Sequence, residues 1–480
     1  MRRRSTAGLV ALSLALAACG GGGSAPGSGT GTAPPTVTPT PTPTPTPSVC
    51  SLRSRQDWAA GQLREWYLFP ETLPASLDPS GFATVEAYVD ALTATARGQG
   101  RDRFFTFLTS IAEENAFFSS GATAAFGIRI QTDTVARRLF VIDAYEGAPA
   151  LAAGIDRGTE IIGIGTTLEN LRSVDSIIAS EGSAGISSAL GPSTAGTSRV
   201  LRIVEPAGTR SLTVTKAEFS IPPISPRFGT QILTDNGQRI GYLNLRTFIT
   251  PADPALRSAF ATFKAQGVSQ IIIDFRYNGG GLVDIADLMG DLLGDNRLAS
   301  DVYSFTTFRP EKSQFNETRQ FRRLAQSIAP VRIAFIGTSG TASASEIVIN
   351  AFTPYLRTGS ALIGTNTFGK PVGQIARDRA ECDDRLRIVA FAEQNAERRG
   401  NYFNGLASEV AASCAAGDSF AQAMGDPAEA STKVALDFLA GRSCTAISTD
   451  PRPAALREGQ RKLVMPARPN AAQREVPGTF

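Results

Sequence analysis

Histidine is absent from all 480 residues of the chain. This absence excludes Ser-His-Asp and Cys-His catalysis, most zinc enzymes and the usual proton shuttle near neutral pH. Any acid–base chemistry must therefore use Asp, Glu, Lys, Tyr or Cys. A large excess of either charge is also absent: the formal net charge is only +3, and no run of Lys and Arg supports a nucleic-acid partner.

Long apolar runs are missing, apart from one short stretch near the start of the chain. "MRRR" followed by "AGLVALSLALAA" is a basic region and an apolar region too short to span a bilayer, so residues 1–18 are predicted to be a signal peptide. The stretch ends in "LAAC", which resembles the lipobox of bacterial lipoproteins. That resemblance implies acylation of Cys19 and, with Gly20 rather than Asp next, an outer-membrane anchor facing the periplasm. A simple secretion signal with an incidental cysteine is the alternative.

Residues 19–49 are rich in Gly, Ser, Thr and Pro and predict an extended tether that separates the lipid anchor from a soluble body. Beyond Cys19 the chain has four cysteines, and an even number in an oxidising compartment indicates two disulfides. Of the three possible pairings we favour Cys382–Cys414 and Cys50–Cys444. Free structural thiols are the alternative.

The body begins with two changes of pattern. Residues 50–117 carry apolar residues at helical spacing and predict a small helical domain, whereas residues 118–218 consist of short β-type runs broken by Gly. The second region resembles a PDZ domain in "FGIRI" and in "VIDAYEGAPALAAGIDRGTEIIGIG". The resemblance implies that Phe126, Gly127 and Ile128 form a loop that binds a peptide carboxylate. A generic small β-domain is the alternative.

Residues 219–445 alternate strands with helices and therefore predict an α/β domain with a mostly parallel sheet. Ligands of such sheets bind beyond the carboxyl ends of the strands. Three loops are expected at that edge: "YNGGG", "TSGTASASE" and "TNTFGKPVGQ". Residues 446–480, rich in Arg, Pro and Ala, predict a disordered tail.

The third loop has the G-x-x-x-x-G-K spacing of a phosphate-binding loop, but Pro371 stands where such a loop needs Ser or Thr, which argues against an NTPase. Lys370 follows Ser343 by 27 residues, the length of one helix-plus-strand crossover. In a protein without histidine, this placement indicates a Ser-Lys dyad. Ser339 and Ser345 remain competing nucleophiles on the residues alone.

Such a dyad makes two physical demands. The lysine pKa must fall by roughly three units below about 10.4, which burial in an apolar pocket can achieve. The tetrahedral oxyanion needs N–H donors, for which we expect Ala344 at a helix N-terminus and Gly279 or Gly280 in the glycine turn. Asp274 and Arg276 are expected to brace that turn rather than react.

At these loops the sequence resembles the C-terminal processing peptidases. "DFRYNGGG" is similar to their D-L-R-x-N-x-G-G, "TASASE" to S-A-S-A-S-E, and "TFGKPVGQ" to T-F-G-K-G-x-x-Q. The resemblance implies a crotonase/ClpP-like α/β domain with Ser343 as nucleophile, Lys370 as general base and Gln374 orienting the lysine.

The resemblance further implies protein or peptide substrates and no metal or cofactor. Pro371, Thr341 and the insertion after residue 377 depart from the family pattern, and the insertion puts the substrate class in doubt. The alternative function is a non-catalytic, lipid-anchored PDZ-type protein that captures protein C-termini.

Overall fold

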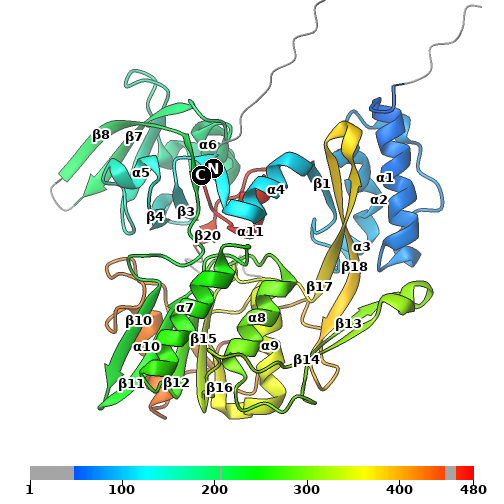
Figure 1. Ribbon diagram of the computed structural model, residues 1–480. Coiled ribbons are helices and arrows are strands. Elements are labelled where there is room, and N and C mark those ends of the chain that lie inside the picture. Colours follow the sequence, from blue (N-terminus) through cyan, green and yellow to red (C-terminus); the bar gives the residue numbers. More distant parts are fainter. Residues whose placement is uncertain (1–47, 206–207, 449–460) are drawn as a thin grey trace, which may run out of the picture. The chain divides into compact units, whose positions relative to one another are not determined.

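The computed structural model describes residues 48–205, 208–448 and 461–480 (Figure 1). The expected signal peptide, Cys19 and nearly all of the expected tether lie outside these residues. No helix within the described ranges has the length and apolar character needed to cross a membrane.

A six-stranded sheet forms the centre of the α/β region, in the order β10-β11-β12-β15-β16-β19. Every neighbouring pair from β11 to β19 is parallel, and β10 is an antiparallel edge strand. The mostly parallel sheet predicted for this region is therefore confirmed. Its strands are β10 (Thr230–Asp235), β11 (Gln238–Asn244), β12 (Gln270–Asp274), β15 (Arg332–Gly337), β16 (Ser360–Gly364) and β19 (Ser413–Ala415).

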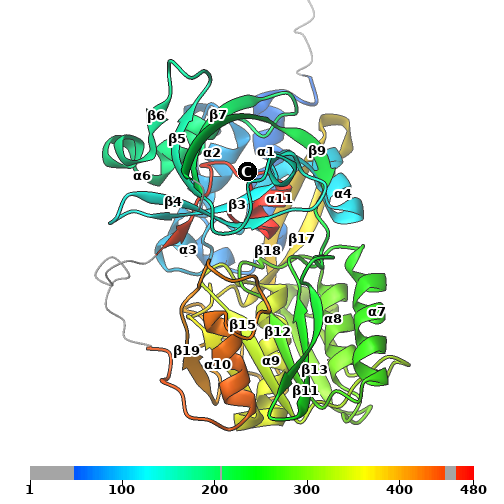
Figure 2. The same cartoon turned by 90° about the vertical axis from the view of Figure 1, so that its left-hand side faces the viewer.

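Helices cover both faces of this sheet, as Figure 2 shows with α10 on one side of the strands and α7 and α8 on the other. The run "QIIID" of β12 is apolar on both faces for this reason. Ile271 and Ile273 pack into the core on the side of α7, α8 and α9, and Ile272 packs against α10. The helices are α7 (Ala252–Ala265), α8 (Val283–Leu293), α9 (Ala344–Leu356) and α10 (Ala430–Leu439).

A second sheet joins the α/β region to the first helices of the body. It runs β1-β18-β13-β14, with β17 also paired to β18. Side chains of β18 such as Leu386 and Ile388 share a core with Leu63 of α1 and Val89 of α2. The elements are α1 (Leu52–Trp66), α2 (Val85–Leu92), α3 (Ala94–Gly98), β1 (Phe107–Ser110), α4 (Ile111–Ser120), β13 (Val302–Phe308), β14 (Glu317–Gln320), β17 (Val372–Arg379) and β18 (Asp384–Gln394).

Short strands build the β-rich region between α4 and the α/β region. Its seven-stranded sheet has the order β20-β3-β4-β5-β7-β8, with β6 paired to β5, while β2 and β9 form a separate pair. The elements are β2 (Ala122–Ala125), β3 (Ile128–Asp133), β4 (Arg138–Ala144), α5 (Pro149–Ala152), β5 (Glu160–Gly165), β6 (Arg172–Ser173), α6 (Val174–Leu190), β7 (Ser198–Glu205), β8 (Gly208–Thr215) and β9 (Ala217–Ser220).

The last twenty residues, predicted as part of a disordered tail, instead fold onto the body. Residues 461–480, which we call the C-terminal segment, contain β20 (Lys462–Leu463) and α11 (Ala471–Glu475), drawn in red in Figure 1. Val464 and Phe480 are buried in the core of the β-rich region. Apolar burial against a strand edge outweighs a composition that is otherwise typical of disorder.

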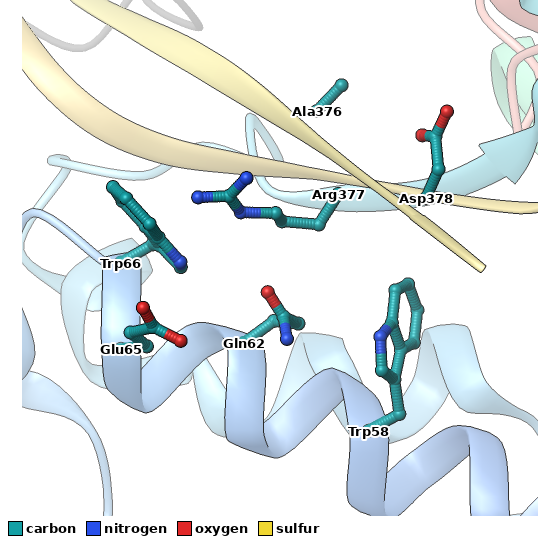
Figure 3. A pocket seen from close by; sticks show the side chains of 7 residues that line it. All are labelled: Trp58, Gln62, Glu65, Trp66, Ala376, Arg377 and Asp378. Carbon is teal, nitrogen blue, oxygen red and sulfur yellow. The ribbon is translucent and has the colours of Figure 1, made fainter.

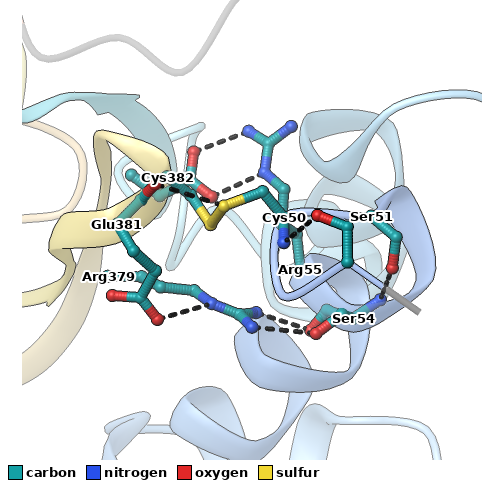
Figure 4. Close-up of a disulfide and its surroundings, with 9 residues drawn as sticks. Cys50, Ser51, Ser54, Arg55, Arg379, Glu381 and Cys382 are labelled. Carbon is teal, nitrogen blue, oxygen red and sulfur yellow. Dashed lines mark hydrogen bonds and ion pairs between the residues drawn. A yellow bond between two sulfur atoms is a disulfide. The ribbon is translucent and has the colours of Figure 1, made fainter. Parts of the chain in front are cut away.

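The disulfide pairing predicted from the sequence, Cys382–Cys414 and Cys50–Cys444, is wrong. The structure joins Cys50 to Cys382 and Cys414 to Cys444, each with a Cα–Cα distance of 5.5 Å. The turn between β17 and β18 lies beside the start of α1, where Arg379 donates to the carbonyl of Ser54 at 2.8 Å (Figure 4). The second pair is close because the Ala415 N–H donates to the carbonyl of Thr445 at 2.7 Å.

Candidate active site

Ser343 lies at the junction between the loop after β15 and the start of α9, at the edge where the parallel strands end. Its φ of 54° and ψ of −117° are unfavourable for a residue with a side chain. Backbone strain of this kind costs about 1–3 kcal/mol and persists only where surrounding contacts enforce it. The residue is half-buried, so its hydroxyl is placed at an accessible edge.

The two competing serines are placed differently. Ser345 is fully buried inside α9, and its hydroxyl donates to the carbonyl of Asn278 at 3.2 Å. Ser339 is exposed in the turn before the helix. Of the three serines in this loop, only Ser343 is both partly accessible and held against the glycine turn.

That glycine turn packs directly on Ser343. A Cβ on Gly280 would lie 2.8 Å from the Ser343 Cβ and 3.2 Å from the Ala344 nitrogen, and Gly280 has a φ of +122°. Only glycine permits this close approach and this conformation. The predicted donors therefore meet at one place: Ala344, whose N–H is at the first position of α9 and has no intrahelical acceptor, and the turn at Gly279 and Gly280.

The two glycine N–H groups have different partners. Gly280 donates to the side-chain oxygen of Asn278 at 2.9 Å. Gly279 donates at 2.9 Å to the main-chain carbonyl of Glu475, in the C-terminal segment. The sequence does not predict this contact.

A buried ionic network holds the strand below the turn. Asp274 receives hydrogen bonds from the Arg276 guanidinium and from the Tyr242 hydroxyl, at 2.9 and 2.7 Å. Arg276 also forms a bidentate pair with Glu429 of the α10 N-terminus, at 3.0 and 2.9 Å. The Arg276 charge lowers the pKa of Glu429 to about 2 against the opposing effect of burial. Asp274 and Arg276 thus brace the turn, as expected.

Lys370 follows β16 and points its Nζ into a half-buried site. Nζ donates to Oε1 of Gln374 at 2.8 Å, and Gln374 in turn donates to the carbonyl of Phe105. Burial lowers the pKa of Lys370, and the carboxylate of Glu475 acts in the opposite direction. Gln374 therefore contacts the lysine from β17. Nζ and the Ser343 hydroxyl, both among the described residues, are not hydrogen-bonded to each other.

Glu346 connects the serine loop with the lysine loop, a role that was not predicted from the sequence. Its carboxylate accepts from the N–H of Ser343 at 3.0 Å, and from the N–H groups of Gly369 and Lys370 at 2.7 Å each. Burial raises its pKa. The sequence signal was present: Ser343 and Glu346 have the S-x-x-E spacing of a helix capping box.

The segment before β1 also supports the lysine loop, and this support was not predicted from the sequence. Arg103 donates to the carbonyls of Phe368, Gly369 and Phe403, which fixes the lysine loop from outside. The ring of Phe105 lies 5.2 Å from the Lys370 Nζ. Because these residues are more than 260 positions before Lys370, no local sequence pattern could predict their contact.

The predicted peptide-binding loop lies at the start of β3. Phe126 and Ile128 are buried, and Gly127 has a φ of +85°. The N–H groups of Gly127 and Ile128 both donate to the main-chain oxygen of Phe480, at 2.9 and 3.1 Å. Both N–H groups therefore bind a peptide oxygen in the structure.

One described pocket lies away from this site. It has a volume of about 500 Å³ and lies between α1 and β17, lined by Trp58, Trp66 and Arg377 among others (Figure 3). None of the candidate catalytic residues lines it. Within the described ranges, no group of three or more Cys, Asp or Glu side chains is arranged to hold a metal ion.

Comparison with known proteins agrees with this geometry. Residues 239–398, which include the glycine turn, Ser343, Lys370 and Gln374, match the family model described as peptidase family S41. This chain contains a peptidase family S41 domain.

The S41 domain has named relatives in plants and cyanobacteria. The chain is 29% identical over 265 residues to carboxyl-terminal-processing peptidase 2, chloroplastic, of Arabidopsis thaliana, covering 52% of this chain and 45% of that protein. It is 24% identical over 253 residues to a carboxyl-terminal-processing protease of Picosynechococcus, covering 52% and 55%. The chain thus matches about half the length of these relatives.

Among solved structures, a crystal structure named as an S41 protease from Bacteroides fragilis NCTC 9343 matches with a TM-score of 0.62. It is 20% identical and covers 80% of this chain and 97% of that one. At this identity the match shows a shared fold.

Proposed function

We propose that the protein is a serine endopeptidase that cleaves peptide bonds by acyl transfer, with Ser343 as nucleophile and Lys370 as general base. The observation that carries this proposal is the convergence of Ser343, the Gly280 turn and the Lys370 loop, joined through Glu346, inside the S41 domain. Carboxyl-terminal-processing proteins among the relatives support the same class of reaction.

The reaction follows from the groups present. Neutral Lys370 takes the proton of the Ser343 hydroxyl while Oγ bonds to the substrate carbonyl carbon. The oxyanion that forms receives hydrogen bonds from the N–H groups of Ala344 and Gly279. Gly279 is the better turn donor because its N–H already meets a main-chain carbonyl, whereas the Gly280 N–H is bound to Asn278.

The second half of the cycle returns the proton. Protonated Lys370 donates it to the departing amine nitrogen as the C–N bond breaks, which leaves an ester on Ser343. Water, deprotonated by Lys370, then hydrolyses the ester and regenerates the hydroxyl. Burial keeps the lysine pKa below its usual value, so a larger fraction of molecules holds the neutral base at mildly alkaline pH.

The test is hydrolysis of denatured casein by the full chain and by two variants. Ser343→Ala is expected to lower the rate at least about 10³-fold, and Ser339→Ala, at the exposed competing serine, to leave it within about threefold. Activity of the full chain should rise with pH through the lowered pKa of Lys370, because only the neutral amine accepts the serine proton. Unchanged turnover in Ser343→Ala would contradict the assignment of the nucleophile.

The envelope location and substrate recognition are further parts of this proposal. We place the mature protein on a lipid anchor at Cys19, facing the periplasm, with the PDZ-like region binding protein substrates through Phe126, Gly127 and Ile128. Incorporation of labelled palmitate into the expressed protein, lost in Cys19→Ser, tests the anchor. The alternative, a non-catalytic PDZ-type binding protein, predicts peptide binding with no Ser343-dependent hydrolysis.

A further inference from the structure

The C-terminal segment contacts both places where a substrate is expected to bind. At one end its main chain pairs with the edge of β3: Lys462 and Leu463 lie opposite Thr132 and Gln131. At the other end Ile130 donates to the carbonyl of Gly478 at 2.9 Å, and Phe480 donates to the carbonyl of Ile128 at 2.8 Å. Addition of a peptide strand to an exposed sheet edge is the way PDZ-type grooves bind their ligands.

Between these two strands the segment passes the glycine turn of the candidate active site. The carbonyl of Glu475 accepts the N–H of Gly279, and a Cβ on Gly279 would lie 2.8 Å from the carbonyl oxygen of Arg474 and 3.0 Å from the Cδ of Pro477. The segment is therefore packed tightly on the turn that is proposed to hold the substrate carbonyl.

The segment is well fixed in this position. Phe480 is 1% exposed, and Ala472 and Val476 pack against Phe117 and Tyr145. Thr479 bonds with the hydroxyl of Tyr145 at 2.8 Å and donates to the carbonyl of Val476 at 2.7 Å. Figure 1 shows α11 close to α4, in agreement with these contacts.

Its conformation is unsuited to cleavage. α11 is helical up to Glu475, and the Val476 N–H, which would become the departing amine, donates to the carbonyl of Ala472 at 2.8 Å. Lys370 is bonded to Gln374 and not to Ser343. Attack requires an engaged base and a free departing amine, whereas here the base bonds to Gln374 and the Val476 N–H is held within the helical turn.

We propose that residues 461–480 are an intramolecular inhibitor that occupies the β3 edge, the Gly127 loop and the Gly279 turn together. This inference rests on the proposed peptidase function. The ligand that displaces the segment is an extended polypeptide with an aromatic residue at the position of Phe480, preceded by small residues as in "GTF". Displacement frees the Gly279 N–H for a substrate carbonyl.

The test compares casein hydrolysis by the full chain with three variants. Phe480→Asp places a charge in the apolar site of Phe480. It is expected to raise the rate at least about fivefold, because it shifts the population toward molecules in which the C-terminal segment is displaced. Thr479→Ala, a milder change for the case in which Phe480→Asp does not fold, should raise it about twofold. Ala467→Asp is the matched control, because Ala467 is exposed in the same segment, and it should match the wild-type chain.

Two readouts separate this inference from the proposed function. A labelled peptide of residues 470–480 should bind to Phe480→Asp, measured by anisotropy, and inhibit it, while binding the Ala467→Asp chain at least tenfold more weakly. Rates of Phe480→Asp and Thr479→Ala no higher than that of Ala467→Asp, with hydrolysis still lost in Ser343→Ala, would overturn the inhibitory role of the segment but not the peptidase function. If no chain hydrolyses casein, the proposed peptidase function is wrong. Equal peptide binding to Phe480→Asp and Ala467→Asp would show that the C-terminal segment does not occupy the peptide site, and would also overturn the inference.

Intact-mass measurement covers the remaining outcome. The full chain should keep its mass on incubation. Loss of residues 476–480 from the wild-type chain, but not from Ser343→Ala, would show that the segment is a substrate and would overturn its role as an inhibitor.

Discussion

The serine half and the lysine half of the candidate site are built in different ways. Ser343 is held by its own loop, by α9 and by the adjacent glycine turn, all within the α/β region. Lys370 bonds its Nζ to the nearby Gln374 but also depends on distant segments: Arg103 fixes its loop, and Glu475 lies close enough to influence its pKa. A strained local turn therefore positions the nucleophile, whereas long-range contacts control the base.

The largest effect on activity is expected from a change at Glu346, because its carboxylate bonds to both the serine loop and the lysine loop. Glu346→Gln replaces an acceptor of three N–H groups by an amide with one oxygen. The expected result is a fall in kcat of about 10²-fold with little change in KM, because positioning rather than binding is lost, and a loss of about 1–3 kcal/mol of stability. Steady-state kinetics and denaturant unfolding measure both effects.

The control for this variant is Glu409→Gln, because Glu409 forms a surface ion pair with Arg399 at 2.9 Å. It should change stability by no more than about 0.5 kcal/mol. If Glu346→Gln behaved like this control, the serine and lysine loops would not depend on the shared carboxylate.

A change at Arg103 tests the lysine half alone. Arg103→Ala leaves the carbonyls of Phe368, Gly369 and Phe403 without their donor and loosens the loop. We expect kcat to fall about tenfold and the alkaline rise of the pH–rate profile to move, because the surroundings of Lys370 change. Arg101→Ala is the matched control, since Arg101 pairs with Glu71 instead. Equal kcat values for the two variants would argue against long-range support of the base.

The smallest effect is expected at Glu475, which acts on the lysine only through charge. Its carboxylate stabilises protonated Lys370 and so raises the lysine pKa. Glu475→Gln removes that charge, so the pKa of Lys370 should fall further and the rise in activity with pH should move to lower pH. The pH dependence of kcat/KM measures the shift. A shift to higher pH would contradict the sign of this interaction.

The same division explains what the sequence could and could not predict. The glycine turn, Ser343 and Lys370 follow strands with clear patterns, and parallel strands bring their ends to one edge, so these residues could be placed together. Glu346 was missed although its capping-box spacing is local. Arg103 and Phe105 could not be found, because their contacts depend on how β1 and β18 pair across the fold.

The disulfides and the C-terminal segment were misjudged for related reasons. Cys50 meets Cys382 only because the β17–β18 turn returns to the start of α1, and cysteine spacing contains no information about that return. The C-terminal segment has no regular apolar period, and its buried residues, such as Val464, Val476 and Phe480, are stable only against β3 and α4. Composition indicated disorder because it does not include the partner surface.

Covalent labelling is the most direct test of whether Ser343 is a nucleophile that Lys370 activates. A fluorophosphonate probe is incubated at pH 8 with the full chain, with Phe480→Asp and with Lys370→Ala, and the modified peptide is identified by mass spectrometry. We expect a single adduct on Ser343, formed faster in Phe480→Asp than in the full chain and at least about 10²-fold slower in Lys370→Ala. An adduct on Ser339 or Ser345, or labelling of Ser343 at an unchanged rate without Lys370, would contradict it.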